Sequence, residues 1–277
     1  MLVSLKEILD IAEKGNFAIP AMNVYNMETV MGVIAAAEEM NAPVILQSYS
    51  RLFTNEEGYY VTPIALAAAK KAKVPVCFHL DHGASEVEAE RAIRYGATGI
   101  MIDKSQLSFE ENVAGTKNMV DLCKAIGIQV EGEIGHVGSA ANGDEQTAEY
   151  TTVEEAKQFV EQTGVAALAI AVGTAHGRYK QAPKLAIDRI AEIHKNVDVA
   201  LVLHGGSGVP DEEIKAAIAA GIRKINFGTD LCFAFLDNVF ATPRTTYAID
   251  LFMKGAIEGV KEFAKSKIEL LGAANKA

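Results

Sequence analysis

Eight short apolar runs alternate with helical patterns from one end of the sequence to the other, and this alternation constrains the fold most. The runs lie at residues 17–24, 43–49, 74–82, 99–103, 128–135, 167–173, 200–205 and 224–230. Several of the amphipathic stretches between them begin with Ser or Asp and end at Gly or Asn, which is the capping chemistry of helices. Strict alternation of strands and helices favours a parallel sheet.

Eight such units in 277 residues predict an α/β fold of the (β/α)8 or TIM barrel type, built as one domain over residues 1–277. The pattern adds an N-terminal helix within residues 1–15 and one long C-terminal helix from Ile249 to Leu271, which could cover the barrel or form an oligomer contact. A doubly wound open sheet is the alternative, but it usually has fewer strands and a glycine-rich first turn. No Pro-, Gly- or Ser-rich linker divides the chain, and residues 136–151 are predicted to form a long loop.

Charge and cysteine usage restrict the partners and the compartment. The net charge of −10 argues against a nucleic-acid or anionic-membrane partner, although a local site can still bind a small anion. No window reaches the roughly 18 uncharged apolar residues of a spanning helix, and the N-terminus lacks the apolar core of a signal peptide. Cys77, Cys123 and Cys232 lie apart in apolar surroundings and form no CxxC pair, so we expect three buried thiols in a reducing compartment. The expected localisation is cytoplasmic.

Polar residues fall at the ends of seven of the predicted strands. In a barrel of this kind the catalytic groups lie at the carboxyl ends of the strands, on one rim. The residues at these positions are Asn23, Asp81, His82, Asp103, Glu133, His176, His204, Asn226 and Thr229. Such a concentration is improbable for packing alone, and it predicts a functional site.

Three of these residues, His82, His176 and His204, suit a zinc ion that keeps an open coordination position. Glu133 and Asp103 could orient the ligands or bind the metal at an alternate position. His79 shares the strand face of Asp81, and we expect it to be packed or to support a ligand. His194 reads as a solvated helix residue, and the role of His136 stays open.

Glycine-rich segments next to these histidines predict an anion site. In "HGGSG", Gly205 and Gly206 allow backbone N–H groups to approach an anion, and Ser207 adds a hydroxyl. The segment "NFGTD" opens the last loop, and the last two loops are the usual phosphate cradle of such barrels. Metal and phosphate side by side predict a small phosphorylated carbonyl or polyol as substrate.

The motifs "HLDHG", "EGEIG", "GTAHGRYK", "LVLHGGSGVP" and "KINFGTD" closely resemble the class II, zinc-dependent ketose-bisphosphate aldolases of the fructose- and tagatose-bisphosphate type. The similarity runs from "AMNVYN" to Pro243–Arg244. It implies reversible aldol cleavage of a ketose bisphosphate into dihydroxyacetone phosphate and an aldehyde such as glyceraldehyde 3-phosphate. It also implies a homodimer or homotetramer.

Carried onto this chain, the resemblance makes His82, His176 and His204 the zinc ligands and Asp81 the acid/base. It places the dihydroxyacetone phosphate half, often with a monovalent cation such as Na⁺ or K⁺, on Gly177, Lys180, Gly205, Ser207, Asn226 and Thr229. The predicted substrate site further includes Asn23, Gly206, Phe227 and Gly228. Arg244 resembles the arginine that reaches the other phosphate across a subunit boundary.

The chain departs from the family pattern at points that bear on the substrate. The usual "GGxED" loop reads "GSAANGDE", which leaves Glu145 or Asp144 as candidates for removing the enolisable proton. Gly228 stands where fructose-bisphosphate aldolases usually carry Asp or Asn, and tagatose-type members carry a small residue. Tagatose bisphosphate, fructose bisphosphate or another ketose phosphate, such as a deoxy-ketogluconate phosphate, therefore remain open.

Three other functions would each explain part of the pattern. A Schiff-base aldolase would use Lys104, but it would not explain three histidines at strand ends. A metal-dependent sugar-phosphate epimerase could use the same zinc and aspartate. A non-catalytic sugar-phosphate-binding barrel would tolerate loss of the base, yet Asp81 is intact.

Overall fold

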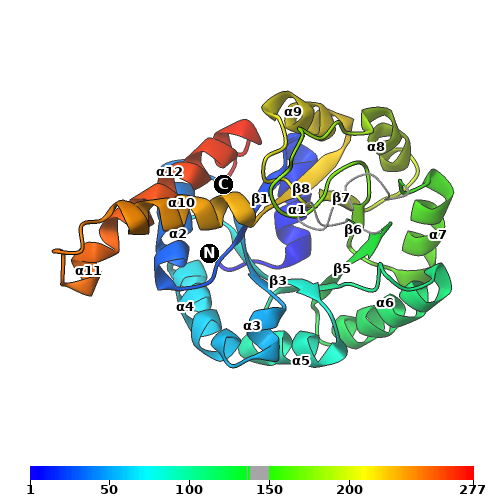
Figure 1. The fold of residues 1–277 in the computed structure, drawn as a ribbon. Helices are drawn as coiled ribbons and strands as arrows, with labels where there is room; N and C mark the ends of the chain where they lie inside the picture. The colour runs from blue at the N-terminus through cyan, green and yellow to red at the C-terminus, as the bar shows by residue number, and fades with distance from the viewer. Residues whose placement is uncertain (136, 138–149) are drawn as a thin grey trace.

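The computed structural model describes residues 1–135, 137 and 150–277, and its eight strands close a parallel barrel in chain order (Figure 1). The strands are β1 (Ile19–Asn23), β2 (Val44–Tyr49), β3 (Val76–Gly83), β4 (Gly99–Ile102), β5 (Gln129–Ile134), β6 (Ala167–Ile170), β7 (Ala200–Leu203) and β8 (Ile222–Phe227). Pairing of β1 with β8, which sets Ala21 opposite Asn226, closes the ring. The predicted (β/α)8 barrel is confirmed, and the open-sheet alternative is wrong.

Helices follow the strands and surround the barrel (Figure 1). In the described residues they are α1 (Leu5–Gly15), α2 (Met27–Glu39), α3 (Arg51–Thr54), α4 (Glu57–Lys71), α5 (Glu86–Tyr95), α6 (Phe109–Lys124), α7 (Val153–Thr163), α8 (Ile187–His194), α9 (Asp211–Ala220), α10 (Thr229–Ala241), α11 (Ile249–Phe252) and α12 (Lys254–Leu270). Nearly all strand residues are buried. A strand covered on both faces reads as an apolar run, which is why the runs were visible in the sequence.

Helix α1 closes the amino-terminal end of the barrel. Its buried face, formed by Leu5, Ile8, Leu9 and Ala12, lies against β1, β3, β5 and β8. The backbone N–H of Leu5 donates to Thr98 O, immediately before β4 begins. Because this end is covered, the carboxyl ends of the strands form the open rim.

The C-terminal helix differs from the sequence prediction. The single helix expected from Ile249 to Leu271 is two helices, α11 and α12, which meet at Met253. Met253 has φ −82° and ψ −8°, so its ψ departs from the value of about −42° of a regular helix and the chain turns there. Helix α12 packs against α2 and α10, whereas the outer part of α10 and α11 extend away from the barrel as an arm (Figure 1).

The structure describes the three cysteines and the length and hydrophobicity of the helices. All three cysteines are free; Cys77 and Cys123 are buried, but Cys232 is only partly buried and lines the cavity described below. The expectation of three buried thiols was therefore wrong for Cys232. None of the helices that the structure describes combines the length and hydrophobicity needed to cross a bilayer.

Candidate active site

Asp81 and His82 are neighbours in β3, yet both side chains line one cavity at the rim. Successive side chains of a regular strand point to opposite faces. Here the pairing of β3 with β4 shifts register between Leu80 and Gly83, and His82 adopts a φ of 49°, which is rare outside glycine. A bulge of this kind re-aims a side chain. It therefore brings a carboxylate and an imidazole from consecutive residues to the same site.

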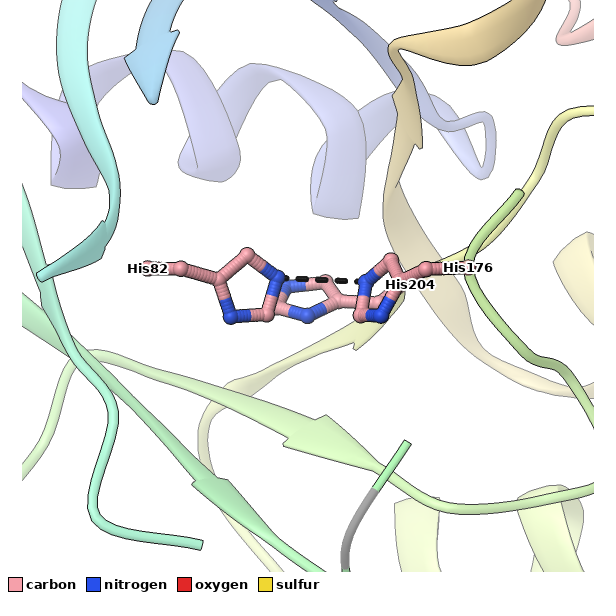
Figure 2. A group of neighbouring side chains, drawn as sticks. All are labelled: His82, His176 and His204. Carbon is pink, nitrogen blue, oxygen red and sulfur yellow. Dashed lines mark hydrogen bonds between the residues drawn. The ribbon is translucent and has the colours of Figure 1, made fainter. Parts of the chain in front are cut away.

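His82, His176 and His204 come together from three separate segments, as Figure 2 shows. The Nε2 atoms of His82 and His176 are 3.2 Å apart. The ring centroid of His82 lies 4.8 Å from that of His176 and 4.6 Å from that of His204. One nitrogen from each of the three rings lies within 4.8 Å of the others. This spacing lets the three imidazoles share one ion.

Two carboxylates adjoin the imidazoles. Asp103 Oδ2 lies 2.7 Å from His82 Nδ1, and Glu133 Oε2 lies 2.9 Å from His204 Nδ1. The Glu133–His204 contact lacks hydrogen-bond geometry, so both buried atoms are left without a hydrogen-bond partner in the described structure. His82, Asp103 and Glu133 form a second group with metal-ligand spacing. Buried nitrogen and oxygen atoms that face one another without a hydrogen bond are suited to act as ligands of a divalent ion.

The protonation of His176 and that of His204 differ because their neighbours differ. Burial, together with the charges of His82 and His204, lowers the pKa of His176 to about 4, so His176 is neutral at pH 7. Burial also lowers the pKa of His204, but its contacts with Glu131 and Glu133 outweigh burial and raise that pKa to about 10. The carboxylates thus create a strong demand for positive charge at His204.

A buried charge cluster forms the floor beneath His204. Glu131 Oε1 lies 2.9 Å from His204 Nε2, and Glu131 Oε2 lies 2.9 Å from Lys224 Nζ. All three side chains are fully buried. His79 Nε2 lies 3.4 Å from Glu131 Oε2, in agreement with a packed histidine near the ligands. When His204 Nε2 carries the proton donated to Glu131, Nδ1 is left as the lone pair that faces a metal.

Asp81 is held by two amides. Asn23 Nδ2 donates to Asp81 Oδ2 at 2.7 Å, and Asn226 Nδ2 donates to Asp81 Oδ1 at 3.1 Å. Gln47 Nε2 in turn donates to Asn23 Oδ1 at 2.9 Å. Burial alone raises the pKa of Asp81, but the charges of His82 and His204 outweigh burial and bring that pKa below its ordinary value. Asp81 is therefore a fixed, ionised carboxylate beside the imidazoles.

The opposite side of the cavity, whose volume is about 570 Å³, is built by the loops after β6, β7 and β8. Five predicted substrate residues from these loops line it: Gly177, Gly205, Ser207, Gly228 and Thr229. Gly205 has a φ of 66°, and a Cβ there would lie 2.4 Å from Ala175 O, so only glycine lets the two loops approach. The cavity therefore meets the amino-terminal end of α10, where backbone N–H groups favour an anion.

Several predicted residues lie elsewhere. Glu133 is buried beside His204, and neither Glu133 nor Gly206 is among the described residues that line the cavity. Phe227 points outward and packs against Phe263 of α12. Lys180 and Arg244 are exposed and are likewise not among the described lining residues. His136, Asp144 and Glu145 lie outside the described residues, as does most of the predicted loop.

Several residues of the site were not predicted from the sequence, among them Tyr25, Tyr49, Arg51, Glu131 and Lys224. Tyr25, Tyr49 and Arg51 line the mouth of the cavity near β1 and β2, and nothing in the sequence distinguishes them from ordinary loop residues. Glu131 and Lys224 did leave a signal. Each lies two positions before a predicted site residue, Glu133 or Asn226, and a charged side chain inside a buried strand needs a partner.

The structure also bears on the Schiff-base rival. Lys104 Nζ donates to Ala84 O at 3.1 Å, and Lys104 is not among the described residues that line the cavity. Lys224 is buried but is paired with Glu131. Neither lysine offers a free amine to a carbonyl in the cavity.

Comparisons with known proteins agree with the geometry. Residues 3–276 match the family described as "Fructose-bisphosphate aldolase class-II". The crystal structure of the YdjI aldolase from Escherichia coli K12 is similar, with 37% sequence identity, a TM-score of 0.91, and 100% of both chains covered. The fructose-bisphosphate aldolase Fba from Campylobacter jejuni is similar at 25% identity and a TM-score of 0.82, over 100% of this chain and 97% of that chain.

Proposed function

Because the chain belongs to the class-II fructose-bisphosphate aldolase family and is an aldolase, we propose that it cleaves a ketose phosphate reversibly in a zinc-dependent reaction. The products are dihydroxyacetone phosphate and an aldehyde such as glyceraldehyde 3-phosphate. The observation that carries the proposal is the placing of three imidazole nitrogens within 4.8 Å of one another beside Asp81, in one cavity. Membership of this family favours an aldolase over an epimerase and over a non-catalytic binding barrel.

His82, His176 and His204 would hold the zinc. Asp103 would orient His82 and Glu131 would orient His204, while Glu133, beside His204 Nδ1, could bind the metal at an alternate position. A bound zinc supplies a Lewis acid that polarises the ketose carbonyl and stabilises the negative charge of the bond-breaking step. The ion should be retained as Zn²⁺ rather than Mg²⁺ because three nitrogen donors suit zinc and a magnesium site is built from oxygen.

Asp81 performs the proton transfer in this proposal. In cleavage, its ionised carboxylate takes the proton from the hydroxyl of the carbon that becomes the aldehyde. The O–H electron pair forms the C=O bond, the C–C bond breaks, and its electron pair passes to the dihydroxyacetone phosphate half, which leaves an enediolate. Protonation of that carbon completes dihydroxyacetone phosphate, and Glu145 or Asp144 is the candidate for this proton transfer. In condensation, Asp81 returns the proton to the new alkoxide. Asn23 and Asn226 keep the carboxylate aimed at this position.

The phosphate of the dihydroxyacetone half binds to Gly177, Gly205, Ser207, Gly228 and Thr229 in this proposal. Ser207 Oγ accepts from Asp230 N at 3.1 Å, which ties the loop after β7 to the first turn of α10. Lys180, at the rim, and Asn226 complete the predicted set, and a Na⁺ or K⁺ ion would lie near the phosphate. Gly228 favours tagatose bisphosphate or another ketose phosphate over fructose bisphosphate, because it lacks the Asp or Asn of the fructose type and a Cβ there would lie 3.1 Å from Asn23 Oδ1.

We propose further that the protein forms a homodimer or homotetramer through the arm. Phe240, Tyr247 and Ile249 on the arm are 81%, 94% and 77% exposed, which is unusual for large apolar side chains. Arg244 lies between them and away from its own cavity. A second copy covering the arm would bury these side chains and bring Arg244 toward the second phosphate in the partner's cavity.

A coupled assay of dihydroxyacetone phosphate release tests the proposal. Fructose and tagatose bisphosphates and other ketose phosphates are offered to the zinc-loaded protein, with and without a chelator. We expect release from at least one substrate, its loss with the chelator, and its return on adding zinc. Release that resists the chelator, together with borohydride trapping of the substrate on the protein, would instead support a Schiff-base mechanism.

A further inference from the structure

Arg51 places a permanent positive charge at the mouth of the cavity. It is the first residue of α3, two positions after β2 ends, and its side chain lines the same cavity as Asp81 and His82. Apart from the histidines, Arg51 is the one basic side chain among the described residues that line the cavity. The predicted phosphate site, by contrast, consists of glycine backbone and hydroxyl groups.

Aromatic rings, rather than carboxylates, hold this guanidinium. Arg51 Cζ lies 5.1 Å from the ring centroid of Tyr49 and 5.4 Å from that of Tyr25. In the described part of the chain, no carboxylate oxygen lies within 4.0 Å of it. The two carboxylates that line the cavity have other partners: Asp81 binds Asn23 and Asn226, and Asp103 binds His82 and Ser105. Stacking on a ring face leaves the N–H edges of a guanidinium free for an anion.

The phenol of Tyr49 adds a hydrogen-bond donor at the same place, whereas the phenol of Tyr25 already contacts Cys232. Both rings line the cavity, and the Tyr49 ring centroid lies 6.0 Å from that of His82. Burial raises the pKa of Tyr25 and of Tyr49, so both phenols stay protonated at neutral pH. Tyr49 also connects Arg51 to the reacting centre, because it lies between Arg51 and a predicted metal ligand.

The barrel places Arg51 opposite the predicted phosphate loop that follows β6, whereas the loop that follows β8 lies nearer to it. In a closed ring of eight strands, β2 lies four strands from β6, so Arg51 and Gly177 stand on opposite walls. Asp81 and His82, on β3, lie next to the Arg51 wall. A ketose phosphate with its phosphate in the glycine loops and its breaking bond at Asp81 therefore extends its other half toward Arg51.

We propose that Arg51, with Tyr25 and Tyr49, binds an anionic group at the end of the aldehyde half that is remote from the bond being broken. A carboxylate and a phosphate share the chemistry that such a site recognises, since a guanidinium fork pairs with either. Arg51 is then a determinant of substrate selectivity that belongs to the same subunit as the reacting centre. The inference rests on the proposed aldolase function.

The test measures condensation of dihydroxyacetone phosphate with paired aldehydes on the zinc-loaded protein. One pair is glyceraldehyde 3-phosphate and neutral glyceraldehyde; the other is succinic semialdehyde, which carries a carboxylate, and neutral butanal. For each pair we determine the ratio of kcat/KM for the anionic aldehyde to kcat/KM for the neutral one. The variants are Arg51→Met, Arg51→Lys and the control Arg94→Met, which changes an exposed arginine of α5.

In Arg51→Met, we expect the ratio to fall about 10- to 100-fold for at least one pair. This is the effect expected when a hydrogen bond to a charged group is lost. The pair affected shows whether phosphate or carboxylate is the natural group. The fall should appear in the KM of the aldehyde and not in the KM of dihydroxyacetone phosphate. Arg51→Lys should restore part of the ratio, and Arg94→Met should leave it unchanged.

Two results would overturn the anion site. An unchanged ratio for both pairs would mean that the guanidinium does not meet the aldehyde. An equal loss for anionic and neutral aldehydes would mean that Arg51 only packs the tyrosines. Exchange of the enolisable proton of dihydroxyacetone phosphate with D₂O, which needs no aldehyde, is measured first on the wild type. Its absence would reject the proposed function rather than the role of Arg51.

Discussion

At the floor of the cavity, Lys224, Glu131 and His204 are fully buried and contact one another, whereas at the mouth Arg51 is exposed and rests on two tyrosine rings. A buried charge must be paired, so each floor residue depends on the others. The mouth carries no such requirement, because water can solvate Arg51. The floor is therefore suited to holding one fixed ion, and the mouth is suited to changing the substrate without disturbing the fold.

The largest expected effect lies at Asp81, where the two regions meet. Asp81→Asn removes the proton acceptor while it keeps the size of the side chain, and we expect kcat for cleavage to fall about 10²- to 10⁴-fold. Bound zinc, measured by elemental analysis, should remain near the wild-type amount, because Asp81 is not a predicted ligand. Wild-type turnover in this variant would reject Asp81 as the acid/base.

The next effect tests the mutual dependence of the floor. Glu131→Leu leaves Lys224 buried without its carboxylate, so we expect the free energy of unfolding to fall by about 3–5 kcal/mol. Urea unfolding of the metal-free protein measures the change. The double variant Glu131→Leu/Lys224→Met removes both charges and should recover much of the loss. If the double variant is no more stable than the single one, the pair does not form as described.

A smaller effect is expected where a carboxylate only orients a ligand. Asp103 Oδ2 lies 2.7 Å from His82 Nδ1, so Asp103→Asn should weaken zinc binding about 10- to 100-fold. Competition with a chromophoric chelator gives the dissociation constant. Asp121→Asn, at an exposed position of α6, is the matched control. Equal affinities for the two variants would show that Asp103 does not support the site.

The smallest effect belongs to the mouth. Tyr49→Leu removes one ring beneath Arg51 but leaves the charge, and we expect the anionic-to-neutral ratio defined above to fall only about 2- to 5-fold. Tyr60→Leu, at an exposed position of α4, is the control. A loss as large as that of Arg51→Met would mean that Arg51 depends on the Tyr49 ring as strongly as the floor residues depend on one another.

The sequence was sufficient for the barrel and for the gathering of its histidines. Each strand is covered on both faces and so leaves a continuous apolar run, and the carboxyl ends of parallel strands must meet on one rim. His82, His176 and His204 could therefore be placed together from strand order alone. The spacing of helical residues could not reveal the turn at Met253, because the periodicity continues through it.

The sequence was less informative about which face of a strand a side chain occupies and about contacts between residues far apart in the chain. Asn226 faces Asp81, but Phe227, the next residue of β8, faces α12, as strand alternation requires. A motif taken as one block does not show this difference in facing. The pairing of Glu131 with Lys224 spans the barrel, and Arg51 lies in a short helix, so neither contact follows from a local pattern.

The bulge in β3 has a consequence for anyone who transplants this chemistry into another scaffold. Copying the residues Asp81 and His82 onto an ideal strand would send one of them to the outer wall, among the helices. The graft must therefore carry the irregular pairing with β4 and the left-handed backbone at His82. A one-residue insertion or deletion in this strand would separate the two functions more thoroughly than many side-chain replacements.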